Sequence, residues 1–84
     1  MRHFIAPLAE QDIEAIGDHI AKDNPRRALT FITELHNQCA KIATLPKAFR
    51  LRPELGENLR SCAYGNYVIF FQNNEHEIII VRVL

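Results

Sequence analysis

The spacing of apolar residues changes at Leu45-Pro46, and this change constrains the fold more than any other feature of the sequence. Upstream, apolar residues recur at intervals of three or four, as they do along one face of a helix. Downstream, they form short runs rich in β-branched and aromatic residues, which favour strands. Because the helical segments come together and are followed by consecutive strands, the sequence predicts an α+β fold.

Two helices are predicted, over Ala9–Asp23 and from Pro25 to about Ala43. Between them, Asn24 suits an N-cap and Pro25 suits the first position of a helix. Because this break is so tight, the two helices should lie antiparallel and side by side. Each helix has an apolar stripe at helical spacing. The stripes consist of Ile13, Ile16 and Ile20 in the first helix, and of Ala28, Phe31, Ile32, Leu35, Cys39 and Ile42 in the second.

The remaining elements are four predicted strands, over Arg2–Ala6, Leu59–Tyr64, Tyr67–Gln72 and Glu77–Leu84. Gly65-Asn66 and Asn73-Asn74 are interpreted as two-residue turns between the last three strands. The predicted fold is therefore a single domain over residues 1–84 with the order β-α-α-β-β-β. Its helical hairpin should pack on one face of a mainly antiparallel four-stranded sheet.

The charge of the 84-residue chain is balanced, with ten basic and ten acidic side chains. Proteins that grip long nucleic acids usually carry a positive excess, so this chain could do so only through a local patch. No apolar run approaches the roughly 20 residues that span a bilayer. Cys39 and Cys62 form neither a metal-binding motif nor a disulfide framework. These features favour a cytoplasmic protein with reduced thiols and no membrane attachment.

The strongest candidates for binding are arginines in the second half of the chain. If both turns have two residues, one sheet face carries Arg60, Tyr64, Tyr67, His76 and Arg82. The other face, which should then pack against the helices, carries Leu59, Ala63, Val68, Phe70, Ile79, Val81 and Val83. A three-residue second turn would instead move Arg82 to the helix-facing side.

Cations and hydroxyls on the open face could bind an acidic peptide or a polyanion. Lys47, Arg50 and Arg52, between the last helix and the next strand, could extend this patch. The alternative is that the loop cations are solvated, and that Arg60 and Arg82 are solvated as well or pair with Glu54, Glu57 or Glu77.

No constellation of residues predicts catalysis or metal binding. Ser61 is the single serine and lies outside any nucleophile motif. His36 and Cys39 are three positions apart, but no second pair at ligand spacing accompanies them, so neither a metal nor a cofactor is expected. Glu54 or Glu57 could act as a general base beside Arg60, although a solvated carboxylate is the simpler interpretation. The status of the protein as an enzyme stays open, with a preference for a binding protein.

The order of elements, together with four stretches of sequence, resembles the RelE/ParE toxin family of type II toxin–antitoxin systems. The stretches are Asp12-Ile13 to Asp23-Asn24-Pro25, Leu45-Pro46 with Arg50 and Arg52, Asn58-Leu59-Arg60-Ser61 with Gly65–Phe71, and Ile78–Leu84. The resemblance implies a toxin that a cognate antitoxin holds inactive. The antitoxin is expected to lay an apolar helix or strand on the toxin surface, including a sheet edge.

The family contains a RelE-like branch that cuts mRNA on the ribosome and a ParE-like branch that poisons DNA gyrase. The Asn24-Pro25 break, Leu59-Arg60-Ser61 and Arg82-Val83-Leu84 resemble the ParE-like branch. The neutral charge departs from the RelE-like pattern, as does an end at Leu84 without a segment that supplies a catalytic Tyr or His. The expected target is therefore gyrase, and the expected target-binding residues are Arg60, Arg82, Arg50, Arg52 and Tyr67. An mRNA endoribonuclease, or an inactive relative that only binds antitoxin, is the alternative.

Overall fold

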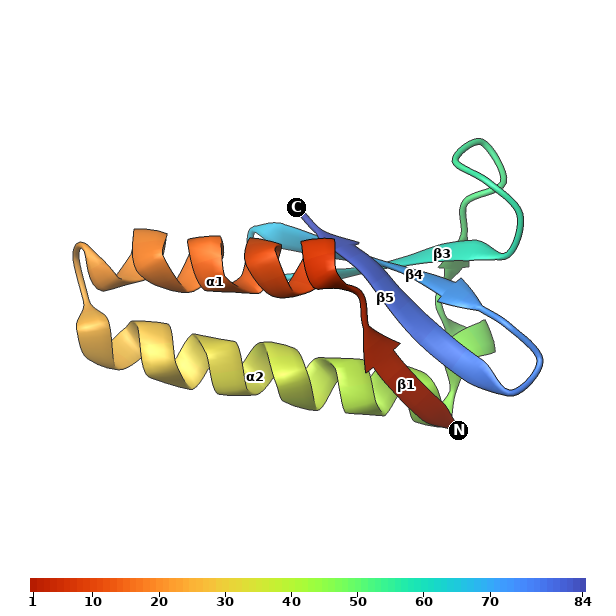
Figure 1. The fold of residues 1–84 in the computed structure, drawn as a ribbon, viewed down its shortest axis with the longest axis horizontal. Helices are drawn as coiled ribbons and strands as arrows, with labels where there is room; N and C mark the ends of the chain where they lie inside the picture. Colours follow the sequence, from red (N-terminus) through yellow and green to blue (C-terminus); the bar gives the residue numbers. More distant parts are fainter.

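The computed structural model describes every residue from Met1 to Leu84 and confirms the α+β class. Two helices pack against one sheet, whose strand order is β1-β5-β4-β3-β2 (Figure 1). The elements are β1 (Arg2–Ile5), α1 (Pro7–Ala21), α2 (Pro25–Thr44), the 3-10 turn η1 (Pro46–Ala48), β2 (Arg50–Leu51), β3 (Leu59–Tyr64), β4 (Tyr67–Asn73) and β5 (Glu77–Val83). The sheet has five strands rather than four, because two residues of the basic segment after α2 pair with β3. A strand of two residues is too short to show the alternation of apolar and polar side chains from which strands are predicted.

The helical hairpin forms as the sequence predicts. Asn24 caps α2, since its side-chain oxygen accepts a hydrogen bond of 3.0 Å from the backbone N–H of Arg27. Pro25 occupies the first turn of α2, and the helices run antiparallel and side by side (Figure 1). The predicted stripe of α2 is buried except for Ile32, which is half-buried. Neither helix combines the length and the apolar character that crossing a bilayer requires.

The hairpin of β3 and β4 has the predicted register. Tyr64 pairs with Tyr67 and Arg60 pairs with Phe71 across the two-residue turn. Gly65 has a φ of 58°, in the left-handed region that glycine adopts without strain, so the turn suits its sequence.

The second hairpin differs from the prediction in two ways. Asn73 pairs with Ile78, so the turn is centred on Glu75-His76 rather than on Asn73-Asn74, and three residues, 74–76, separate β4 from β5. The backbone N–H of Asn74 closes this loop by donating to the carbonyl of Glu77. Farther along, Phe71 pairs with Ile80 but Phe70 pairs with Arg82, which makes Val81 the extra residue of a β-bulge. The bulge reverses the alternation, so Arg60 and Arg82 belong to opposite faces of the sheet.

The prediction of which sheet face packs on the helices was wrong. The buried sheet residues are Cys62, Ile69, Phe71, Ile78, Ile80 and Val83, and only the last of these was assigned to the core face. Half-buried or exposed residues on the open side are Ala63, Val68, Phe70 and Ile79. Strands β4 and β5 are apolar on both faces, so alternation could not identify the core side. The assignment depended on keeping Arg60 out of the core, and the structure achieves this differently.

Candidate functional site

The five predicted target-binding residues do not form one patch. Arg60 lies on the helix side of the sheet and Arg82 on the opposite side, while Arg50 and Arg52 flank the short edge strand β2. Tyr67 begins β4, at the far end of the β3–β4 hairpin from Arg60. The single arginine-lined open face expected from the sequence is therefore wrong, and each residue has its own surroundings.

Arg82 forms an ion pair with Asp12 of α1. Its Nε and Nη2 atoms donate to the two carboxylate oxygens at 2.7 and 2.9 Å. The Val83 backbone N–H donates to the same carboxylate at 2.9 Å, where β5 continues past its last pairing with β1. The hydrogen bonds from Arg82, with the one from Val83, hold the pKa of Asp12 below its ordinary value. Arg82 thus ties β5 to α1, which lies beside the C-terminal end of that strand in Figure 1. The prediction of a free cation is wrong for Arg82.

The two arginines around β2 differ from each other. Arg52 donates to the carboxylate of Glu54 at 2.7 Å and to the hydroxyl of Ser61 at 3.2 Å. Pairing with a nearby glutamate, the alternative raised by the sequence for Arg60 and Arg82, thus holds for Arg52. Arg50 is exposed and has no side-chain partner. Next to it, Leu51 is also exposed, so this edge of the sheet is open and partly apolar.

Tyr67 packs at the other end of the molecule, with its ring 5.8 Å from the ring of Phe31. A recess of about 430 Å³ lies here, between the tip of the β3–β4 hairpin and the break between the helices. The neighbouring Tyr64 hydroxyl donates to Glu34, which also pairs with Arg27 at 2.6 Å. These bonds join the hairpin tip to α2, so the aromatic residues at this end have a structural role.

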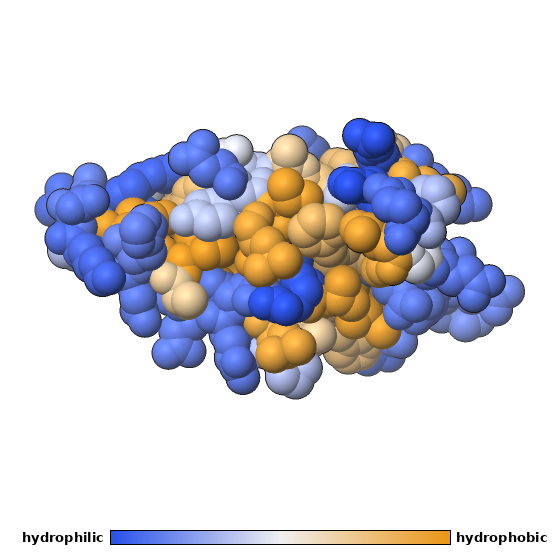
Figure 2. Space-filling view, turned by 90° about the horizontal axis from the view of Figure 1, so that it is seen from above, coloured by the Kyte–Doolittle hydropathy of each residue, from blue (hydrophilic) through white to orange (hydrophobic).

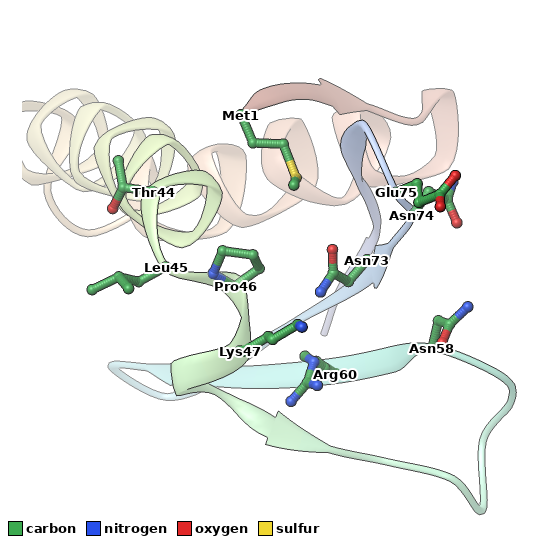
Figure 3. A pocket seen from close by; sticks show the side chains of 10 residues that line it. All are labelled: Met1, Thr44, Leu45, Pro46, Lys47, Asn58, Arg60, Asn73, Asn74 and Glu75. Carbon is green, nitrogen blue, oxygen red and sulfur yellow. The ribbon is translucent and has the colours of Figure 1, made fainter.

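The site with the most polar chemistry is a recess of about 600 Å³ around Arg60, which we call the Arg60 recess. Its lining residues are Met1, Thr44, Leu45, Pro46, Lys47, Asn58, Arg60, Asn73, Asn74 and Glu75. In Figure 3, Lys47, Arg60 and Asn73 lie together in the middle of the recess and come from η1, β3 and β4. Leu45 and Thr44 lie at one end, whereas Asn58, Asn74 and Glu75 lie at the other.

The recess exists because α2 ends before the sheet does. Leu45-Pro46 turns the chain into η1, so the last residue of α2 and residues of η1, rather than the apolar stripe of α2, line the recess at Arg60. Arg60 pairs across the ladder with the fully buried Phe71, and its side chain lines the recess rather than the hydrophobic core cluster. Nη1 of Arg60 donates to the carbonyl of Phe49 at 2.8 Å. This hydrogen bond offsets part of the free-energy cost of placing the guanidinium on the core side, while Nε stays buried without an acceptor.

Sequence reasoning found Arg60 and Lys47 but missed the three asparagines of the recess. Asn58 has a φ of 59°, and its carbonyl accepts a hydrogen bond from the Asn73 backbone N–H. The bond fixes the two asparagines near each other although they lie in different segments. The tolerance of asparagine for this left-handed conformation is the one signal that the sequence offers for Asn58.

The sheet face away from the helices is a second candidate surface. Val68, Phe70, Ile79 and Val81 are half-buried, and no element covers them. Leu8 and Leu84 are exposed, with 54% and 57% of their surface accessible. Figure 2 shows apolar atoms gathered across the middle of one face of the molecule, with hydrophilic residues at both ends. An apolar surface of this kind on a small domain is typical of a protein-binding site.

Comparison with known proteins agrees with this architecture. Residues 4–84 match the family described as the ParE toxin of type II toxin-antitoxin system, parDE. A solved structure described as a chromosomal ParDE TA system from P. aeruginosa has a TM-score of 0.83 and 22% identity to this chain. The similarity covers 99% of this chain and 92% of that one, and at this identity it shows a shared fold. A search of curated proteins finds no match. Because the family match extends over almost the whole sequence, the chain belongs to the ParE toxin family of type II toxin–antitoxin systems.

Proposed function

We propose that this chain is a toxin that inhibits bacterial DNA gyrase by binding to it, and that a cognate antitoxin neutralises it in the cytoplasm. The observation that carries the proposal is the match to the ParE family over residues 4–84. The whole chain, residues 1–84, would act as a single domain around its one hydrophobic core cluster. Target recognition is assigned to the Arg60 recess and to the exposed Arg50 beside it.

The distribution of cations favours binding over RNA cleavage. Arg60 and Arg82 belong to opposite sheet faces, and the carboxylate of Asp12 neutralises Arg82. The chain as a whole carries no net charge. An enzyme that cuts RNA must hold several phosphates and stabilise charge at the cleaved bond, for which converging cations are the usual means. This arrangement supports the ParE-like branch of the family.

The antitoxin is proposed to cover the open sheet face. The half-buried Val68, Phe70 and Ile79 would gain burial under an apolar helix. The free edge at Arg50–Leu51 could add an extended segment by main-chain hydrogen bonds. Toward the other edge of the sheet, the Val83 N–H already donates a hydrogen bond to Asp12, so an added strand could not pair with it. The open face and the β2 edge together would provide one continuous surface.

The proposal is tested by expressing the chain in bacteria, alone and with the antitoxin encoded by an adjacent reading frame. DNA synthesis and protein synthesis are followed by pulse labelling. A gyrase inhibitor should reduce DNA synthesis first, and the antitoxin should restore growth. If protein synthesis falls first and mRNA is cleaved, the chain is an endoribonuclease instead. If growth continues unchanged, the chain is an inactive relative, and the proposal is wrong.

A further inference from the structure

We propose that the Arg60 recess binds a carboxylate of a protein partner, presented by a segment in which an acidic residue stands next to an apolar one. The proposal deepens the function above and rests on it only in that a toxin must contact protein partners. It depends on three observations: the unpaired state of Arg60, the donors around it, and the apolar end of the recess.

Arg60 differs from the other arginines that are partly withdrawn from solvent. Arg52 and Arg82, the other half-buried arginines, each pair with a carboxylate at 2.7 Å. Arg60 has no carboxylate partner, and its single hydrogen bond goes to a main-chain carbonyl. Its Nε atom is buried and has no acceptor, and Nη2 makes no hydrogen bond within the chain. Because Nε is enclosed, Nη2 is the unpaired donor that an anion in the recess can reach, and a negative charge there would also stabilise the guanidinium as a whole.

The residues around Arg60 offer donors rather than a competing anion. Lys47 adds a second cation, and Asn58, Asn73 and Asn74 add side-chain amides (Figure 3). Glu75 is the one carboxylate that lines the recess, and its side chain is 93% exposed. Because Glu75 lies at the end opposite Leu45 in Figure 3, the middle of the recess keeps a positive charge. A planar carboxylate matches the fork of donors that a guanidinium presents.

The other end of the recess determines which molecule carries the carboxylate. Leu45, at this end, is 67% exposed, and Pro46 follows it in η1, while Met1, at the start of β1, lines another side of the recess and is 56% exposed (Figure 3). An apolar side chain next to the acidic residue would cover these groups. A nucleic acid fits poorly, because no aromatic ring lines the recess to stack a base and only two cationic side chains line it. An acidic–apolar polypeptide segment satisfies both ends at once.

The test uses the full chain and needs neither gyrase nor antitoxin, so its failure would overturn the role given to the recess, while gyrase inhibition itself is decided separately by the pulse-labelling experiment. The ¹⁵N-labelled protein is titrated with a blocked Leu-Glu-Leu peptide while the Nε–H resonance of Arg60 is followed by NMR. We expect a saturable shift of that resonance and of the Asn58 and Asn73 amides, with an affinity on the order of 1 mM. The matched peptide Leu-Gln-Leu should cause no saturable shift.

Variants separate the recess from general charge. Arg60→Lys keeps the charge but loses the fork, and the asparagine-amide shifts should weaken about tenfold. Lys47→Gln should weaken binding by a smaller factor, while Arg26→Gln, at an exposed arginine of α2 outside the recess, should leave it unchanged. The spectrum of each variant reports whether it is folded. Equal binding by Arg60→Lys, no shift with the acidic peptide, or tighter binding of inorganic phosphate than of the peptide would each overturn the proposal.

Discussion

Three consecutive isoleucines in β5 provide a direct test of which sheet face carries the core. Ile78 and Ile80 are fully buried, whereas Ile79 between them is half-buried on the open face. Substitution of each by valine removes one methylene group and keeps the β-branched shape, so strand propensity is nearly constant across the series. Any difference among the three variants therefore reports burial.

The expected magnitudes follow from that burial. A buried methylene contributes about 0.8 kcal/mol, and the small cavity left behind brings the cost of Ile78→Val or Ile80→Val to about 1 kcal/mol. For a domain of this size, about 1 kcal/mol lowers Tm by about 4–8 °C. Ile79→Val should cost less than half as much, because part of its side chain is already in contact with water.

The assay is urea unfolding followed by circular dichroism, with the slope m compared across the three variants to confirm that only stability changes. If Ile79→Val is as destabilising as its two neighbours, the core face has been assigned wrongly. In that case Arg60 would lie on the open face, and the Arg60 recess would not exist as described.

Three further predictions concern groups with defined partners. Asp12→Asn should destabilise the fold at pH 7, because the pKa of Asp12 is lowered in the native state: its stabilisation is present above the ordinary value of 3.8 and is lost as pH falls through the native value. In urea unfolding, the difference in stability from the unmodified chain should therefore shrink below pH 3.8, and a constant difference would contradict the role of the ion pair. Asn24→Ala should cost about 0.5–2 kcal/mol by removing the cap of α2, while Asn37→Ala, at an exposed position of the same helix, should not destabilise; equal losses in thermal unfolding would disprove the cap. Burial raises the pKa of the Cys39 thiol to about 11, so Cys39 should resist iodoacetamide at pH 8 until the chain unfolds. Rapid labelling of Cys39 in the native protein, read by peptide mass spectrometry, would show that the thiol is accessible and ionised.

Local signals were sufficient to predict much of the fold. Asn24-Pro25 marks both the end of one helix and the capped start of the next, and Gly65-Asn66 fixes the register of β3 and β4. In each case the chemistry of two or three adjacent residues determines the backbone. The apolar stripe of α2 was equally clear, because its period is helical over about four turns.

The errors came from features that depend on distant contacts. The bulge at Val81 has no local signature, yet it separates Arg60 and Arg82 onto opposite faces. Two apolar faces on β4 and β5 left the core side undetermined until the helices were in place. Arg82 was expected to be free because its partner, Asp12, lies 70 positions away in the sequence. Arg60 was assigned to the open face because the point at which α2 ends, relative to the sheet, could not be foreseen.

The central claim, that this ParE-family chain inhibits gyrase through contacts at the Arg60 recess, is tested most directly with purified components. The full chain is titrated into a DNA supercoiling assay with bacterial gyrase, beside folded Arg60→Gln and Arg26→Gln variants. We expect inhibition by the unmodified chain, equal inhibition by Arg26→Gln, and inhibition by Arg60→Gln that requires at least about tenfold more protein, since a lost charged contact is worth about 1.5–3 kcal/mol. Full supercoiling at every concentration of the unmodified chain would contradict the gyrase target, and equal inhibition by all three proteins would contradict the role of the recess.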